Sequence, residues 1–222
     1  AGQDIHQVLK YAEDRMYRNK MLEMDSVRSS LISSLMNALT EKSQENEDHA
    51  ERLEIMAVAV GREMGLDDNY LADLTLLARL HDLGKVVLPD EILSKEGPLT
   101  DEEWMQIRTH PEAGFRIAQT SPEMAPVARA ILSHHERYDG KGYPQGIKGE
   151  EIPLIARVIA VADAYDAMTS GRPYRPAITH REAIDEIERC AGTQFDPRIA
   201  QIFVRIFADG PPWDQGCGGD RQ

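Results

Sequence analysis

The sequence predicts an all-α fold, a bundle of seven or more helices with a long N-terminal helical arm. Three observations lead to this prediction. Apolar residues recur at helical spacing along most of the chain, residues that start helices are frequent, and alternating strand patterns are almost absent. With 222 residues and ordinary apolar content, the chain can bury the core of one large domain with an appendage.

The N-terminal part of the chain accounts for three expected helices. Their apolar periodicity covers about residues 5–24, 26–61 and 69–83. The first two together are longer than a compact core needs. A bundle extension or a dimer contact explains this length most simply, and a signalling helix from an upstream domain is the sharper interpretation.

The remaining helices have recognisable starts. Each combines a side chain that caps a helix N-terminus, or a proline suited to a first turn, with apolar residues downstream. These starts are Thr100-Asp-Glu-Glu103, Ser121-Pro122, Pro153, Thr179-His-Arg-Glu182 and Asp196-Pro197.

Helix ends and loops are also indicated. Pro111 disfavours helical geometry at His110 and predicts a break there. The helix from Ser121 is expected to end near His134 and the helix from Pro153 near residue 170. The Gly- and Pro-rich stretch 138–153 is expected to be a loop, and residues 209–222 a flexible tail.

Charge and cysteine content exclude several classes of function. The formal net charge of −13 argues against binding long nucleic acid through a basic surface, so a small anionic ligand would need locally placed cations. Cys190 and Cys217 lack metal-type spacing and fit a reducing compartment. No apolar run reaches the roughly 18 residues of a membrane span, and no signal peptide is visible. These features favour a cytoplasmic protein.

Histidines and carboxylates form the strongest chemical pattern. An adjacent pair such as His81-Asp82 is costly to bury at the end of an apolar helix unless it is paired or binds a metal. Glu45 and His49, four residues apart, would share one helix face. The other candidate ligands are His110, His134, His135 and Asp163. A lone histidine is more often structural, as assumed here for His6 and His180, and Glu45 and His49 could lie on a solvated face.

This donor set indicates the type of metal chemistry. Imidazole and carboxylate ligands without thiolates suit iron, manganese, cobalt, nickel or zinc. The candidates exceed what one ion needs, and Asp82 could bridge two ions. Two metals roughly 3.5–4 Å apart can clamp a phosphate ester and provide a bridging hydroxide at neutral pH.

Several motifs make the family recognisable. His81-Asp-Leu-Gly-Lys85 resembles the HD motif of the HD hydrolase superfamily, and His110-Pro-Glu-Ala-Gly114 resembles a second block. The stretch from His134 to Pro144 resembles the GYP signature of the HD-GYP subfamily. Val161-Ala-Asp-Ala-Tyr-Asp166, Arg172-Pro-Tyr-Arg175 and Phe195-Asp-Pro197 follow in family order. The resemblance covers about residues 45–207.

The resemblance implies an HD-domain helical bundle that hydrolyses the bacterial second messenger cyclic di-GMP to pGpG. A second hydrolysis, of pGpG to GMP, is also compatible with the resemblance. His49, His81, Asp82 and Asp163 match the family's first metal set, and His110, His134 and His135 match the second, with Asp82 bridging. Glu45 matches the ligand of a third metal in some members. Those members usually have Glu-Thr-Gly-x-His, whereas this chain has Glu45-Asn-Glu-Asp-His49. Two or three divalent ions, iron or manganese, are therefore expected.

Substrate contacts are implied by the same resemblance. Lys85 matches a lysine that reaches substrate phosphate, and Tyr143 a residue that contacts the substrate. A salt bridge for Lys85 and turn packing for Tyr143 are the structural alternatives. Arg172 and Arg175 suit bidentate phosphate contacts. Asp139 and Asp166 are interpreted as structural.

Residues 11–20 resemble the last helix of a GGDEF diguanylate cyclase domain. Residues 1–25 are therefore interpreted as a linker from an upstream GGDEF-like or sensor domain, and residues 26–208 as the HD-GYP domain. A homodimer through the N-terminal helices is expected. Alternative functions are a non-catalytic cyclic-dinucleotide sensor, a hydrolase of the mixed guanine–adenine cyclic dinucleotide, and the di-iron oxygen chemistry of related helical HD proteins.

Overall fold

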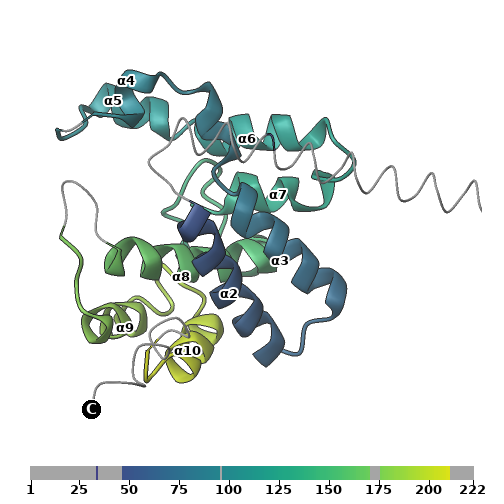
Figure 1. Cartoon of the computed structure of the whole chain (residues 1–222), viewed down its shortest axis with the longest axis vertical. Coiled ribbons are helices and arrows are strands. Elements are labelled where there is room, and N and C mark those ends of the chain that lie inside the picture. Colours follow the sequence, from purple (N-terminus) through teal and green to yellow (C-terminus); the bar gives the residue numbers. More distant parts are fainter. Residues whose placement is uncertain (1–33, 35–46, 96, 171–175, 211–222) are drawn as a thin grey trace, which may run out of the picture. The chain divides into compact units, whose positions relative to one another are not determined.

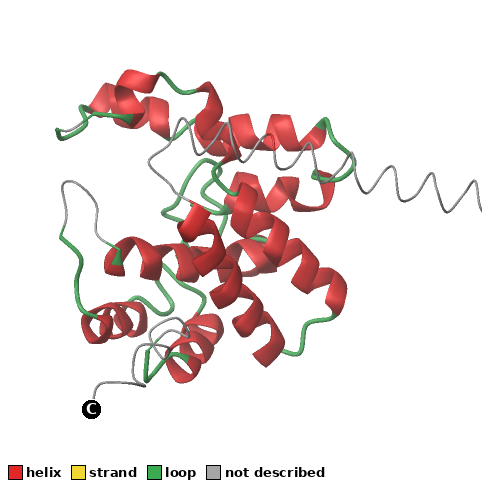
Figure 2. Cartoon of the chain, in the orientation of Figure 1, coloured by secondary structure: helices red, strands yellow, loops and turns green. Residues whose placement is uncertain are grey.

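The structure is a computed structural model that describes residues 34, 47–95, 97–170 and 176–210. The described residues other than Ser34 belong to one compact unit, Leu39–Gln222. The described residues contain helices and loops, and their only β pairing is an isolated bridge between Ala191 and Phe195 (Figure 2). The predicted all-α fold with seven or more helices is confirmed. The linker 1–25, most of the expected N-terminal arm up to residue 46 and the tail beyond Gly210 lie outside the described residues. The end of the helix expected over 26–61 corresponds to α2 (Glu47–Glu63).

The described helices follow one another with short connections. The α-helices are α2 (Glu47–Glu63), α3 (Asp68–Leu80), α4 (Asp90–Leu93), α5 (Asp101–Ile107), α6 (His110–Gln119), α7 (Ala125–Ser133), α8 (Leu154–Thr169), α9 (His180–Arg189) and α10 (Pro197–Ile206). Two 3₁₀ turns, η1 (Leu83–Val87) and η2 (Gly149–Glu151), complete the set.

Helix α8 is the centre of the bundle. It contacts α2, α3, α7, α9 and α10 (Figure 1). It is apolar around most of its circumference, which is expected of a helix surrounded by others. Its buried residues include Ile155, Ile159 and Tyr165. Because Asp163 and Asp166 interrupt this apolar helix, their carboxylates are carried into the interior of the bundle.

The predicted helix starts are mostly confirmed. Thr100 and Thr179 each form a reciprocal capping box with a glutamate three residues later, which satisfies two backbone N–H groups at each helix start. The Asp196 carboxylate accepts hydrogen bonds from two backbone N–H groups of α10. Pro153 precedes the first residue of α8. Local side-chain chemistry thus fixes these helix ends.

Two predicted boundaries are wrong. The helix expected from Ser121 begins at Ala125, because the Ser121 carbonyl first accepts hydrogen bonds from Met124 and Ala125 in a turn. The helix expected to reach Leu83 ends at Leu80, and the chain turns into η1. His81 and Asp82 therefore lie in the junction between two helical segments.

Two further expectations can be compared with the described residues. No helix in that part of the chain combines the length and apolar content needed to cross a bilayer. Cys190 is a buried free thiol, and Cys217 lies outside the described residues.

Candidate metal centre

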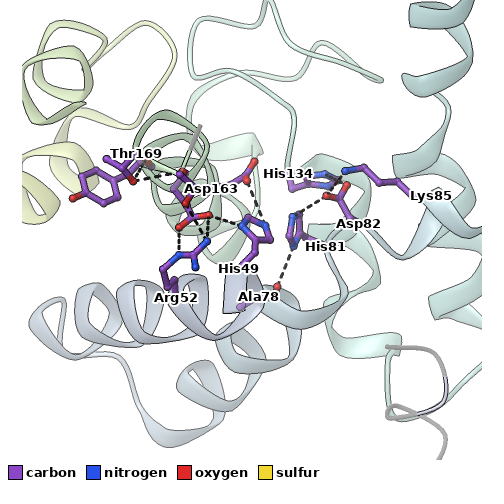
Figure 3. Close-up of polar contacts among 12 residues, drawn as sticks. His49, Arg52, Ala78, His81, Asp82, Lys85, His134, Asp163 and Thr169 are labelled. Atoms are coloured by element: carbon purple, nitrogen blue, oxygen red, sulfur yellow. Dashed lines mark hydrogen bonds and ion pairs between the residues drawn. The ribbon is translucent and has the colours of Figure 1, made fainter. Parts of the chain in front are cut away.

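Five helical elements bring the seven described candidate ligands together in two clusters. One cluster contains His49, His81 and Asp163, and the other contains Asp82, His110, His134 and His135. Within each cluster, one donor atom from every member lies within 4.8 Å of the others. Figure 3 shows His49 of α2 facing Asp163 of α8, with His81 and Asp82 beside them. Residues distant in sequence thus form one continuous group of potential ligands.

Asp82 lies between the two clusters. Its Oδ2 atom is 3.1 Å from Nε2 of His81, which belongs to the first cluster. Its Oδ1 atom is 3.0 Å from Nε2 of His110 and 3.8 Å from Nε2 of His134, in the second cluster. The two oxygens of one carboxylate therefore face different clusters, the arrangement that a bridging ligand requires.

The backbone fixes the tautomer of three of these histidines. In His81, His110 and His134, Nδ1 lies 2.6–3.1 Å from the carbonyl oxygen three residues earlier in the chain. A carbonyl oxygen only accepts hydrogen bonds, so each Nδ1 carries a proton, and in the neutral ring the lone pair is left on Nε2. Each Nε2 atom then presents a lone pair to the cluster, as a metal ligand does.

The convergence of these lone pairs tests whether the site suits a metal. Nε2 of His110 lies 3.3 Å from Nε2 of His134 and 3.0 Å from the buried Oδ1 of Asp82. When both rings are neutral, with their proton at Nδ1, no proton lies between these three acceptor atoms. Acceptors held this closely repel one another unless a cation lies among them. The donor set therefore fits a divalent metal.

Burial keeps two of these rings neutral. It lowers the pKa of His134 well below its ordinary value, and the neighbouring His135 ring lowers it further. Burial likewise lowers the pKa of His135 to about 4, against the opposing effect of the Asp82 carboxylate. Both imidazoles are therefore neutral at neutral pH, which is the form that binds metals.

Lys85 contributes the positive charge closest to Asp82. Its Nζ atom donates a hydrogen bond of 2.8 Å to Asp82 Oδ2. Burial raises the pKa of the Asp82 carboxyl, but the nearby Lys85 ammonium group and the hydrogen bonds with His81 and His110 outweigh this and hold the pKa well below its usual range. The salt bridge considered as the structural alternative for Lys85 is thus present, and it holds the ammonium group against the centre of the site.

A close backbone contact sets the distance between Asp82 and His110. Gly84, in η1, packs against the start of α6, where a Cβ atom on it would lie 1.8 Å from the His110 carbonyl oxygen. That Cβ would also lie 2.6 Å from the backbone nitrogen of Gly114. Only glycine allows η1 and α6 to approach this closely.

The loop after His135 forms one wall of the site. The Tyr143 ring stacks on His135 with centroids 4.9 Å apart, and the Arg108 guanidinium lies 5.2 Å from the Tyr143 ring centroid. The buried Glu136 carboxylate accepts hydrogen bonds from the backbone N–H groups of Gln145 and Gly146. Burial raises the pKa of Tyr143, so the phenol stays protonated.

Sequence reasoning missed several of these contacts. Asp166, interpreted as structural, accepts a hydrogen bond of 2.7 Å from Nδ1 of His49, and Arg52 donates to the same carboxylate. Arg108 was not singled out, although its position two residues before His110 was an available signal. Glu45, Arg172 and Arg175 lie outside the described residues.

Comparison with known proteins identifies the family. The HD domain family matches residues 31–199, most of the chain. The chain belongs to the HD domain family. The predicted relationship to the HD superfamily is therefore confirmed, and the His81-Asp82 pair lies at the junction of the two clusters.

Individual relatives of this HD domain include named phosphodiesterases. A Thermotoga maritima protein named cyclic di-GMP phosphodiesterase is 38% identical over 178 residues, covering 79% of the chain and 48% of that relative. The 3′3′-cGAMP-specific phosphodiesterase 2 of Vibrio cholerae is 31% identical over 188 residues, 84% of the chain and 36% of that relative. The chain thus spans about half the length of the first and about a third of the second.

A solved structure supports the fold. The cyclic GMP-AMP-specific phosphodiesterase V-cGAP3 of Vibrio cholerae matches with a TM-score of 0.62 at 22% identity. The match covers 86% of the chain and 51% of that structure. The chain therefore shares the overall helical fold of that structure.

Proposed function

We propose that this chain is a metal-dependent phosphodiesterase that hydrolyses cyclic di-GMP to the linear dinucleotide pGpG. The observation that carries the proposal is the position of Asp82, whose two oxygens face two clusters of potential metal ligands. Two adjacent sites of this kind suit phosphodiester cleavage. The relative from Thermotoga maritima, named cyclic di-GMP phosphodiesterase, supports the choice of substrate.

The metals in this proposal are two or three divalent ions, iron or manganese. His49, His81, Asp82 and Asp163 would hold one ion, and Asp82, His110, His134 and His135 another; Glu45 would serve a third. Such ions would polarise a phosphoryl oxygen and lower the pKa of bound water. Imidazole and carboxylate donors without thiolates fit this choice of metals.

The chain's own residues would bind and orient the substrate. Lys85 places an ammonium group beside Asp82, where it would offset negative charge on the scissile phosphate. Tyr143, stacked on His135, would contact the substrate from the loop side. Arg172 and Arg175 would bind the phosphates of the dinucleotide through bidentate contacts.

Arg108, whose guanidinium lies over the Tyr143 ring, would be a further cation that binds the substrate. Replacing Arg108 with Ala is expected to raise the KM for cyclic di-GMP by about 10- to 150-fold, since a charge-assisted hydrogen bond contributes about 1.5–3 kcal/mol. The matched control is Arg116→Ala, an exposed arginine of α6 that pairs with Glu112. Steady-state kinetics on both variants provide the measurement. Equal KM values for the two variants would contradict a role of Arg108 in substrate binding.

Substrate identity is tested with a panel of cyclic dinucleotides under anaerobic conditions. Cyclic di-GMP, the mixed guanine–adenine dinucleotide and cyclic di-AMP would be incubated with metal-loaded protein, and products separated by chromatography. We expect cyclic di-GMP to be consumed fastest, with pGpG as the first product; GMP would appear later if a second cut occurs. Bound metal and ligand without turnover would instead identify a cyclic-dinucleotide sensor.

The mixed guanine–adenine dinucleotide is the second candidate substrate. The Vibrio cholerae relative named as specific for 3′3′-cGAMP is 31% identical over most of the chain. Faster hydrolysis of that dinucleotide in the same panel would select this alternative and reject cyclic di-GMP as the preferred substrate.

Two proposals concern the N-terminal part of the chain. Residues 1–25 would link the HD domain to an upstream sensor or GGDEF-like domain, and the N-terminal helices would mediate a homodimer. Sedimentation of the chain with and without residues 1–25 tests the dimer: the longer form should sediment as a dimer and the shorter as a monomer. Two monomers would refute it.

A further inference from the structure

His49 differs from the other histidines in the partner of its Nδ1 atom. His81, His110 and His134 donate from Nδ1 to backbone carbonyls three residues away. His49 instead lies 2.7 Å from Oδ2 of Asp166, a carboxylate 117 residues later in the chain. A carboxylate that is itself held by Arg52 accepts this hydrogen bond, so Nδ1 of His49 carries the proton.

Helix α8 contacts both nitrogens of the His49 ring. Asp163 and Asp166 are three residues apart, so they lie on one face of α8, which packs against α2. The Oδ1 atom of Asp163 lies 3.8 Å from Nε2 of His49, and Asp166 bonds Nδ1. One turn of α8 thus supplies a candidate metal ligand and, beside it, the group that orients the neighbouring ligand.

Arg52 holds the Asp166 carboxylate in place. It follows His49 by three residues on α2, and Figure 3 shows its guanidinium directed at the carboxylate on α8. Its Nε donates to Oδ1 over 2.5 Å and its Nη2 to Oδ2 over 2.9 Å. This two-pronged contact fixes both oxygens of Asp166, whose side chain is only 2% exposed.

We propose that Asp166, fixed by Arg52, is a positioning residue of the metal centre. It orients His49 so that Nε2 faces the cluster formed with His81 and Asp163, and retention of the ion in that cluster depends on it. The inference rests on the proposed metal-dependent function. Partners of this kind typically change metal affinity about 10–100-fold, because they fix the tautomer and raise the basicity of the ligand.

The test replaces Asp166 with Asn, which keeps the size of the side chain and removes its charge. Metal-free protein would be titrated anaerobically with Mn²⁺, and retained metal would be counted by elemental analysis after dialysis. We expect the Kd of one ion to rise about 10–100-fold and retained metal to fall by about one equivalent. Imidazole ¹⁵N shifts of the metal-free protein should also report loss of the single His49 tautomer.

Asp196→Asn is the matched control. Asp196 forms a similarly buried ion pair with Arg157 of α8, but within the described part of the chain its hydrogen bonds and ion pair involve no candidate ligand. This variant should lose stability without losing a metal equivalent. A second test variant, Arg52→Lys, keeps the charge near Asp166 without the two-pronged contact and should give an intermediate Kd. It also provides the test if Asp166→Asn fails to fold.

The outcomes separate this inference from the proposed function. Unaltered Mn²⁺ affinity in a folded Asp166→Asn or Arg52→Lys variant would overturn the positioning role and leave the metal centre intact. An equal loss of metal in Asp196→Asn would also overturn it, because the effect would then be general. Wild-type protein that binds no metal would refute the metal centre, and the positioning role with it.

Discussion

Replacing Asp82 with Asn is expected to remove bound metal and to lower turnover of cyclic di-GMP about a thousandfold. The substitution preserves the shape of the side chain but removes the charge that faces both clusters. A thousandfold loss of turnover corresponds to about 4 kcal/mol of transition-state stabilisation. Several kcal/mol is the contribution expected of metal ions that stabilise charge on a phosphate. Elemental analysis and single-turnover kinetics on the same preparation would measure both effects.

Asp185→Asn is the control for this substitution. Asp185 lies on α9, where it pairs with Arg181 of the same helix, so the same chemical change occurs away from the clusters. It should retain metal and turnover. An Asp82→Asn protein that hydrolyses cyclic di-GMP at the wild-type rate would show that Asp82 does not bridge the reactive centre.

Replacing Gly84 with Ala is expected to have the largest effect on stability. The added Cβ would meet the His110 carbonyl oxygen and the Gly114 backbone nitrogen, neither of which can rotate away. Overpacking of this kind costs typically 1–3 kcal/mol, and we expect about 3 kcal/mol because backbone must move. For a chain of this length the Tm should fall by roughly 6–12 °C. Urea unfolding and thermal melts of the metal-free protein provide the measurement.

Gly97→Ala is the matched control, since a Cβ at Gly97 would have no neighbour within 4 Å. It should change the free energy of unfolding by less than about 0.5 kcal/mol. Separation of η1 from α6 should also move His110 away from Asp82, so Gly84→Ala should bind Mn²⁺ more weakly. A Gly84→Ala protein as stable as Gly97→Ala would contradict the close contact of η1 with α6.

Local sequence patterns predicted most of the fold. Some helix starts depend only on residues within one helical turn, so they can be predicted without knowledge of the tertiary structure. They are the capping boxes at Thr100 and Thr179 and the start at Asp196-Pro197. The seven described candidate ligands were found because imidazoles and carboxylates interrupt otherwise apolar helices, and the family motifs grouped them. The structure brings these seven side chains together.

Contacts between distant segments could not be predicted in this way. Asp166 meets His49 only because α8 packs on α2, and no local pattern distinguishes it from a structural aspartate. The stacking of Arg108 on Tyr143 depends likewise on the fold of the loop after His135. The junction at His81 was placed inside a helix because apolar periodicity continues through Leu83, whereas the backbone tightens into a 3₁₀ turn after Asp82.

The most direct test of the central claim is elemental analysis of anaerobically purified protein together with its cyclic di-GMP turnover, before and after chelation. We expect two or three equivalents of iron or manganese, with turnover lost on chelation and restored by the metal. A metal content near three equivalents per chain would support Glu45 as a ligand, and a content near two equivalents would exclude it. Hydrolysis that persists in fully metal-free protein would contradict the proposed metal-dependent phosphodiesterase.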